Sequence, residues 1–261
     1  MKIDILTLFP DMFMPVLGRS ITGRAIENGI LNIGIHDIRE YSSDRHRKVD
    51  DYPFGGGQGM VMFPQPIFDC IRDVGTEGRR MIYMSPRGRQ LDRKLAEELA
   101  CEESVLILCG HYEGVDQRVI DHFRMEEISI GDYILTGGEL PAMVLVDTVA
   151  RLIPGVLSGS ASALDESVYS GLLEYPQYSQ PRSYEGLDVP EVLTGGNHRL
   201  IDLWRYGESL KLTKERRPDL FEKYVRKIRH LEDEERRKGV KKPKILSKEE
   251  KQILESLLER D

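Results

Sequence analysis

The sequence predicts an α/β fold with a mostly parallel sheet and helices on both faces, followed by a small all-helical domain. Strand-like apolar runs alternate with helical patterns over the first 157 residues, and strand signals are absent after residue 171. Strands that alternate with helices form parallel sheets, because each helix carries the chain back across the sheet. The composition agrees, since 40% hydrophobic and 31% charged residues in a chain of 261 are typical of globular proteins.

Five strands and five helices are predicted in the first domain. The predicted strands cover residues 1–9, 30–35, 80–84, 105–109 and 127–130. The predicted helices cover residues 10–29, 66–74, 91–101, 115–123 and 139–153. Residues 37–60 form a long, polar, glycine-rich loop, and loops of this length inside compact domains are usually functional or mobile.

A linker separates the two predicted domains. Residues 158–171 are small and polar and have no sustained apolar period. We therefore predict one domain at 1–157 and a second at 172–261. In the second domain, apolar residues recur at helical spacing between positions 220 and 231. Ser247 and Glu250 form a capping box, which predicts the start of another helix.

The cysteines and the apolar runs limit the classes of protein. Cys70, Cys101 and Cys109 form no CxxC pair, which is typical of reduced thiols in the cytoplasm, and no metal site is predicted. The first residues lack the basic start and long apolar run of a signal peptide. Charged residues interrupt the most apolar window, 141–157, so no membrane segment is expected. We expect a cytoplasmic protein.

The charge is distributed unevenly. The net charge of −7 argues against a protein that coats nucleic acid non-specifically. Residues 211–244, however, carry 14 basic and 7 acidic side chains, a local charge of +7 that leaves −14 for the remainder. Such a stretch suits contact with a phosphate backbone, and it equally suits a solvated, salt-bridged helical surface.

The glycine cluster at 54–60 does not match the common nucleotide-binding loops. A Walker loop requires Gly-Lys-Ser/Thr after four intervening residues, and a dinucleotide fingerprint requires GxGxxG directly after a strand. Neither pattern occurs here. The cluster is either part of a ligand site or only a turn with positive φ angles.

Three glycine-containing turns follow predicted strands, at residues 84–88, 109–114 and 130–141. Parallel α/β sheets bind ligands beyond the carboxyl ends of their strands. Glycine allows a ligand to touch backbone N–H and C=O groups, which can recognise the edge of an adenine. The three turns therefore predict a shared pocket for a nucleoside-shaped ligand, although each taken alone is an ordinary strand-to-helix turn.

These residues resemble the bacterial tRNA (guanine-N1)-methyltransferases of the TrmD type. The matching segments are 48–60, 110–116, 130–141, 151–157 and 171–178, and the likeness extends from Met1 to about Arg216. The resemblance implies a SPOUT-class methyltransferase with a deep trefoil knot that binds S-adenosylmethionine. It also implies a homodimer with active sites shared between subunits. The implied product is a methyl group on N1 of guanosine 37, in the anticodon stem-loop of tRNA.

The resemblance also implies which residues hold S-adenosylmethionine, mostly through main-chain groups. They are Met84, Ser85, Pro86, Gly110, Tyr112, Glu113, Gly114, Ile130, Gly131, Asp132, Tyr133, Ile134, Leu135, Gly137, Gly138 and Pro141. The carboxylate of Glu113 suits the ammonium group of the methionine portion. Its alternative role is that of an acid at a helix N-terminus, where it complements the helix dipole.

The reaction requires a base, because neutral guanine carries a proton on N1, and a cation for the charge that develops towards O6. The family's base is an aspartate that precedes a serine in the linker. Glu166 precedes Ser167 here, and Asp165 lies just ahead of it, so either acid is a candidate. Arg151 occupies the family's position for a cation near the target base, and its alternative is a helix-surface pair with Asp147.

The second domain is expected to bind the unpaired anticodon loop, where bases are accessible. Asn197 and His198 are candidates to position the loop, or are equally a helix cap and its neighbour. Gln180 stands where the family commonly has arginine, and Arg182 is two positions away. These departures keep a second hypothesis open, a non-catalytic RNA-binding protein on the same scaffold. A small-molecule nucleotide enzyme is a third hypothesis, which only the general architecture favours.

Overall fold

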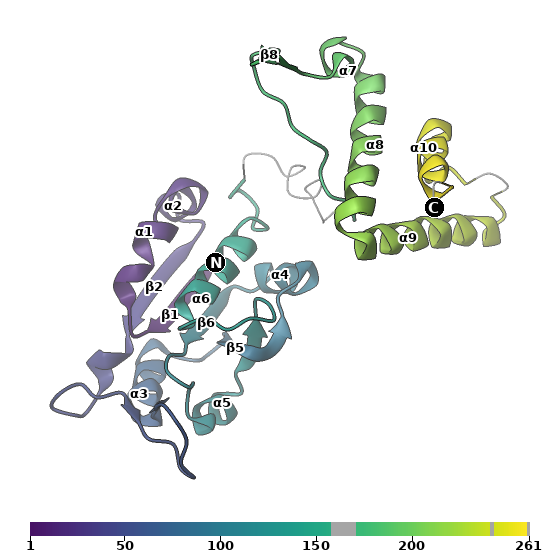
Figure 1. Ribbon diagram of the computed structural model, residues 1–261. Helices are drawn as coiled ribbons and strands as arrows, with labels where there is room; N and C mark the ends of the chain where they lie inside the picture. Colours follow the sequence, from purple (N-terminus) through teal and green to yellow (C-terminus); the bar gives the residue numbers. More distant parts are fainter. Residues whose placement is uncertain (158–170, 241–242, 260–261) are drawn as a thin grey trace. The chain divides into compact units, whose positions relative to one another are not determined.

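The structure is a computed structural model, and it describes residues 1–157, 171–240 and 243–259. Two compact units make up the chain, and the first ends at residue 163. The division falls inside the segment 158–171 (Figure 1).

A five-stranded sheet forms the centre of the first unit, in the order β2-β1-β6-β5-β7. All its neighbouring strands are parallel. The strands are β1 (Lys2–Thr7), β2 (Asn32–Asp37), β5 (Arg80–Gln90), β6 (Ser104–Cys109) and β7 (Glu126–Ser129). This order confirms the predicted α/β class with a mostly parallel sheet.

Helices cover both faces of this sheet, as predicted. They are η1 (Pro10–Met12), α1 (Met14–Leu17), α2 (Ser20–Glu27), η2 (Ile38–Tyr41), α3 (Pro64–Val74), α4 (Arg93–Ala100), α5 (Gln117–Phe123) and α6 (Glu139–Ala150). One core layer joins side chains of α1, α2, α4 and α6 to alternate sheet residues such as Ile3 and Ile5. The other joins α3 and α5 to residues such as Leu6 and Leu108.

Two predicted segments differ from the structure. The single helix predicted at 10–29 is wrong, because the chain breaks into η1, α1 and α2. Gly18 ends α1, and a Cβ atom on Gly23 would lie 2.6 Å from the carbonyl of Gly18, so the chain turns tightly there. The loop at 37–60 also contains structure, since β3 (Asp50–Asp51) pairs with β4 (Val61–Met62).

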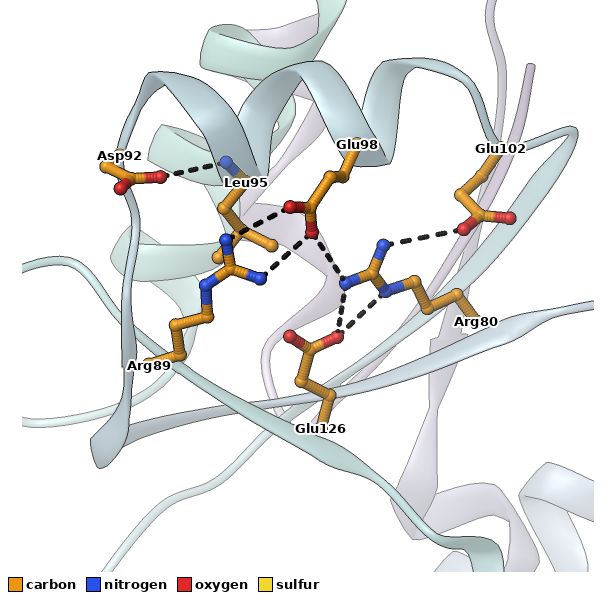
Figure 2. Close-up of polar contacts among 7 residues, drawn as sticks. All are labelled: Arg80, Arg89, Asp92, Leu95, Glu98, Glu102 and Glu126. Atoms are coloured by element: carbon orange, nitrogen blue, oxygen red, sulfur yellow. Dashed lines mark hydrogen bonds and ion pairs between the residues drawn. The ribbon is translucent and has the colours of Figure 1, made fainter.

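Figure 2 shows an ion-pair network that joins both ends of β5 to α4. The Glu98 carboxylate lies 2.9 Å from Arg89 and 3.6 Å from Arg80. Arg80 also contacts Glu126 of β7 at 2.7 Å and Glu102 at 3.4 Å. Burial alone would lower the pKa of Arg80, but these carboxylates raise it. The hydrogen bond from Arg89 holds the pKa of Glu98 below its ordinary value.

This shared carboxylate requires a bend in β5. An unbroken strand would separate Arg80 from Arg89 by about 30 Å, too far for both side chains to reach one carboxylate. The chain instead makes an excursion at residues 85–88, and Met84 and Arg89 both lie opposite Ile128 of β7. The excursion places the turn after Met84 beside the carboxyl end of β7.

Gly88 makes this return possible. A Cβ atom at this position would lie 2.2 to 2.4 Å from backbone atoms of Glu127 and Ile128. Backbone atoms cannot move aside as a flexible side chain can, so only glycine fits here. This close approach of Gly88 to β7 brings the predicted turn at 84–88 next to the one at 130–141.

The second unit is helical apart from one short hairpin. Its elements are β8 (Ser183–Tyr184), β9 (Leu187–Asp188), α7 (Glu191–Thr194), α8 (His198–Arg216), α9 (Pro218–Arg237) and α10 (Lys248–Leu258). The hairpin corrects the prediction of an all-helical domain. Its turn has positive φ at Glu185 and Gly186, as a tight hairpin requires, but two-residue strands carry no period to detect.

A small core holds the helices of the second unit together. Leu210 of α8, Phe221 of α9 and Leu254 of α10 are among its buried members. Both bonds of the predicted capping box are present, because Ser247 and Glu250 exchange side chain-to-backbone hydrogen bonds. Among the helices of the described residues, none has the length and apolar character needed to span a membrane.

A buried carboxylate joins β1 to β2 and to the segment before β5. Asp4 is 2% exposed and accepts hydrogen bonds from His36 (2.7 Å) and Arg79 (2.5 Å), and it lies 3.2 Å from Lys2. Burial alone would raise the pKa of Asp4, but these partners lower it. Gly34 leaves the space that the carboxylate occupies, because a Cβ atom there would lie 2.3 Å from Oδ1.

We expect Asp4→Asn to lower the free energy of unfolding by about 3 kcal/mol at pH 7, because it leaves the buried Arg79 without its counter-charge. The folded-state pKa of Asp4 is lowered, so its contribution is complete above the unfolded pKa of about 3.9. The contribution is lost as the pH falls through the lower folded value. Urea denaturation of both proteins between pH 7 and pH 3 measures the difference, which should shrink below about pH 4. Asp188→Asn, at an exposed site, is the matched control, and a constant difference would contradict the expectation.

Candidate functional site

A pocket of about 410 Å³ lies at the carboxyl ends of β5, β6 and β7. Pockets of this size accommodate small organic ligands, and this edge is where parallel sheets bind them. The three turns predicted from the sequence all contribute to the lining. The sheet order brings them together, since β5 and β6 are neighbours and β7 lies beside β5.

Fifteen of the sixteen residues predicted to hold a cofactor line this pocket. They are Met84, Ser85, Pro86, Gly110, Tyr112, Glu113, Gly114, Ile130, Gly131, Tyr133, Ile134, Leu135, Gly137, Gly138 and Pro141. Asp132 is exposed and does not line it. The sequence interpretation missed Tyr83, His111, Ile128, Ser129 and Thr136, which complete the lining.

Direct backbone contact fixes two of the turns against each other. The N–H of Gly138 donates a 2.8 Å hydrogen bond to the carbonyl of Gly110. A Cβ atom on Gly138 would lie 2.8 Å from Cα of Cys109, and one on Gly110 would lie 2.8 Å from the Tyr83 hydroxyl oxygen. A larger residue at position 138 would force the two turns apart, whereas one at position 110 would displace the Tyr83 side chain.

The glycine cluster at 54–60 reaches this site. Gly59 has a φ of +84°, and a Cβ atom there would lie 2.4 Å from the Glu113 carboxylate. The N–H of Glu113 donates to the carbonyl of Met60 at 2.9 Å, so the cluster and the β6 turn are joined. Asp116, and not Glu113, caps α5, which argues against the alternative role of Glu113 as a helix N-terminal acid.

A buried carboxylate lies behind the pocket and was not predicted. Glu139 is 3% exposed, and its Oε1 accepts a 2.8 Å hydrogen bond from the Thr7 hydroxyl. Its Oε2 lies 4.0 Å from Nδ1 of His111. This nitrogen atom is buried and has no hydrogen-bond partner among the described residues. Burial, and then the charge of Glu139, raise the pKa of the Cys109 thiol well above its ordinary value. The carboxylate therefore connects α6 to β1 beneath the turns.

Strain marks the mouth of the pocket. Tyr112 has a φ of +58°, which residues other than glycine rarely adopt, and the residue is 42% exposed. Such conformations persist only where the surroundings enforce them, and they are common at functional sites. The rings of Phe9 and Tyr112 both lie about 5 Å from that of His111, at 5.0 and 5.1 Å.

The predicted catalytic residues are only partly described. Arg151 is half-buried and lies at the C-terminal end of α6. Its backbone N–H donates a hydrogen bond to the carbonyl of Asp147. Glu166 and Asp165 lie outside the described residues, so their roles stay predictions.

Ion pairs occupy much of the basic stretch at 211–244. The pairs include Lys211–Glu208 at 2.6 Å, Arg217–Asp219 at 2.8 Å and Arg226–Glu222 at 2.7 Å. These contacts match the salt-bridged surface that was one of the two interpretations, and the net excess of positive charge persists. Asn197 caps α8, because its side chain accepts a hydrogen bond from the N–H of Leu200.

The first unit has a parallel sheet, and glycine-containing turns surround a pocket at its strand ends. These features place the protein in the class of α/β proteins that bind a ligand at the carboxyl edge of the sheet. Comparison with known proteins gives the family. Residues 1–223 match the family model described as "tRNA (Guanine-1)-methyltransferase TrmD". The chain therefore belongs to this family.

Curated relatives support the assignment. A tRNA (guanine-N(1)-)-methyltransferase of Alkaliphilus oremlandii is 56% identical over 233 residues, which cover 86% of this chain and 94% of the relative. The protein with the same name from Ruminiclostridium cellulolyticum is 55% identical and is covered over 99% of its length, with 87% of this chain. The one from Clostridioides difficile is 51% identical, and the match covers 98% of that relative and 85% of this chain.

The hydrogen bond between Thr7 and Glu139 should stabilise the site. We expect Thr7→Val to lower the free energy of unfolding by about 1 to 3 kcal/mol, because it leaves a buried carboxylate without its donor. Thr7→Ser retains the hydroxyl group and should recover most of this loss. Melting temperatures followed by circular dichroism compare the two variants. Equal melting temperatures would show that the hydrogen bond contributes nothing.

Proposed function

We propose that the protein transfers a methyl group from S-adenosylmethionine to N1 of guanosine 37 in tRNA. One observation carries the proposal: the segments that match the tRNA (guanine-N1)-methyltransferase family contain the glycine turns that enclose the pocket. A tRNA substrate also implies the cytoplasm as the place of action.

The pocket fits the proposed methyl donor. Its volume of about 410 Å³ lies in the range that encloses small organic ligands. Gly110 and Gly138 both line the cavity, so the backbone of the two turns, and not a side chain, forms its wall at this point. The carboxylate of Glu113 lines the same cavity and suits an ammonium group. When bound, S-adenosylmethionine supplies an electrophilic methyl group on a sulfonium sulfur.

The chain's own residues supply the proton chemistry. Glu166 or Asp165 removes the proton from guanine N1, and a positioned general base typically contributes a factor of 10² to 10⁴ in rate. Arg151 stabilises the negative charge that develops towards O6, which is typically worth a further factor of about 10² to 10³. The buried pair of Thr7 and Glu139 holds α6 and therefore the turn before it in place.

A deep trefoil knot is part of the proposal. The excursion at 85–88, which leaves β7 and returns to it, supports a chain crossing at this point. The exclusion of any side chain at Gly88 supports it further. General topology rules make knots rare, so only the family resemblance suggested one.

A homodimer is also part of the proposal. Five apolar side chains of η1, α1 and α6, with their neighbours, are between 39% and 56% exposed: Phe9, Met12, Val16, Leu140 and Val144. Because α1 contacts both η1 and α6, these exposed side chains come from neighbouring elements, and they are here called the apolar patch. Soluble proteins rarely expose such patches unless a partner covers them. A second copy of the chain is the partner we propose.

The methyl-transfer assay tests the activity. Labelled S-adenosylmethionine should label a tRNA transcript with G at position 37 and leave the A37 transcript unlabelled. Alanine in place of the true base, at Glu166 or Asp165, should lower kcat by about 10² to 10⁴. Glu77→Ala, at an exposed acid of the first unit, is the control.

Two outcomes would contradict the proposal. Equal labelling of the A37 transcript would exclude guanine N1 as the target. Binding of tRNA without any transfer of label would favour the non-catalytic RNA-binding alternative.

The apolar patch predicts the oligomeric state. We expect the wild-type protein to sediment with twice the chain mass of 29.9 kDa, and Val144→Asp to shift it towards the monomer, because a buried charge without a partner is costly. Leu187→Asp, at a 76% exposed site on β9, should leave the mass unchanged. A wild-type monomer, or a dimer that survives Val144→Asp, would argue against this patch as the interface.

A further inference from the structure

A second cavity lies entirely within the second unit. Its volume is about 390 Å³, and its lining comes from the segment before β8, from Val189 just after β9, from α7 and from the first half of α8. It shares no residue with the pocket at the strand ends. Its residues lie within the region that matches the family model. The proposed methyl transfer uses none of them, neither to bind S-adenosylmethionine nor as the base.

Flat side chains form its walls. The Arg205 guanidinium lies over the ring of Tyr175, 4.9 Å from the centroid. Tyr178 is 48% exposed, and its ring centroid lies 6.3 Å from that of Trp204. Aromatic and guanidinium planes are the surfaces on which unpaired nucleobases stack.

The charge of the lining favours an anion. Arg182 and Arg205 line the cavity, and no carboxylate does among the described residues. Nε of Arg205 is buried without a hydrogen-bond acceptor in the described parts of the chain, although its Nη1 lies 3.7 Å from Asp202. No ion pair of the Arg182 side chain occurs within those parts either. Buried donors are normally paired, so an acceptor from a ligand accounts for this one.

Amide side chains supply the remaining polar groups. Gln177 and Gln180 line the cavity, and they can both donate and accept hydrogen bonds at the edge of a base. A neutral peptide would account for the apolar walls, but it would leave the two cations of the lining without an anion.

We propose that this cavity binds one unpaired nucleotide of the tRNA, separate from the guanosine that is methylated. The base stacks on the exposed Tyr178 ring, and Arg182 and Arg205 meet its phosphates. This inference rests on the proposed tRNA substrate. It assigns the second unit a specific contact, in place of a general attraction between phosphates and the basic stretch.

The chain has a natural reporter for this contact. Trp204 is its only tryptophan, and its ring borders that of Tyr178. A nucleotide that stacks beside it should change its fluorescence. We therefore expect tRNA, and the isolated anticodon stem-loop RNA, to change the Trp204 emission of the full-length protein with a saturable dependence on concentration.

Three variants test the assignment. Tyr178→Ala should weaken tRNA binding by about 5- to 100-fold at constant salt, the usual effect of removing one stacked base contact. The KM for tRNA should rise with it, while kcat and the affinity for S-adenosylmethionine stay unchanged. Arg182→Gln should reduce the slope of log K against log salt by about 0.7 to 0.9, the effect of losing one phosphate contact. Tyr184→Ala is the matched control, because Tyr184 is 64% exposed in the same unit and lies outside the lining.

The outcomes separate this inference from the proposed function. Suppose that the wild-type protein methylates G37, but tRNA does not change its Trp204 emission and both Tyr178→Ala and Arg182→Gln bind tRNA with the wild-type affinity. The cavity is then not a nucleotide site. If tRNA changes the Trp204 emission and Tyr178→Ala weakens binding, but no methyl group moves, the cavity assignment holds and the proposed activity fails. Circular dichroism of each variant shows that its second unit is folded.

Discussion

The contact between the backbones of Gly110 and Gly138 is the constraint on which the site depends. Their hydrogen bond of 2.8 Å fixes the turn after β6 against the start of α6 without a side chain between them. Backbone groups near such a contact keep their positions when a ligand arrives, so little ordering remains to be done on binding. The buried Glu139 carboxylate reinforces this arrangement from behind, because it joins the same helix to the end of β1.

Much of the first unit could be predicted because its strands are apolar runs bounded by turn residues. The predictions failed where local pattern did not decide the structure. The helical period at 10–29 continues across Gly18, but a tight approach of Gly23 to Gly18 breaks the helix in three dimensions. The return of the chain at 85–88 depends on β7, which comes about forty residues later, so no local window contains the information. The hairpin of the second unit is too short to have a period.

Some residues of the candidate site could be predicted from the sequence, and others could not. The turns could be predicted because glycine follows an apolar run in each of them, and parallel strands bring such turns to one edge. Thr7, His111 and Glu139 were missed because they come from three separate elements and only the fold brings them together. Glu139 had a weak signal, since it is an acid at the start of an otherwise apolar helix. The departures from the family at Glu166 and Gln180 could be recognised only by resemblance.

The network around Glu98 has a consequence for the order in which the protein forms during translation. Arg80, Arg89 and Glu98 all leave the ribosome before Glu126 does. The two arginines and α4 can therefore assemble first, while the last carboxylate arrives only with β7. The bend of β5 and the last ion pair therefore form together when β7 arrives, because Met84 and Arg89 both lie opposite Ile128 of that strand. Ion pairs suit this late step, because they can open and close in water until β7 has paired.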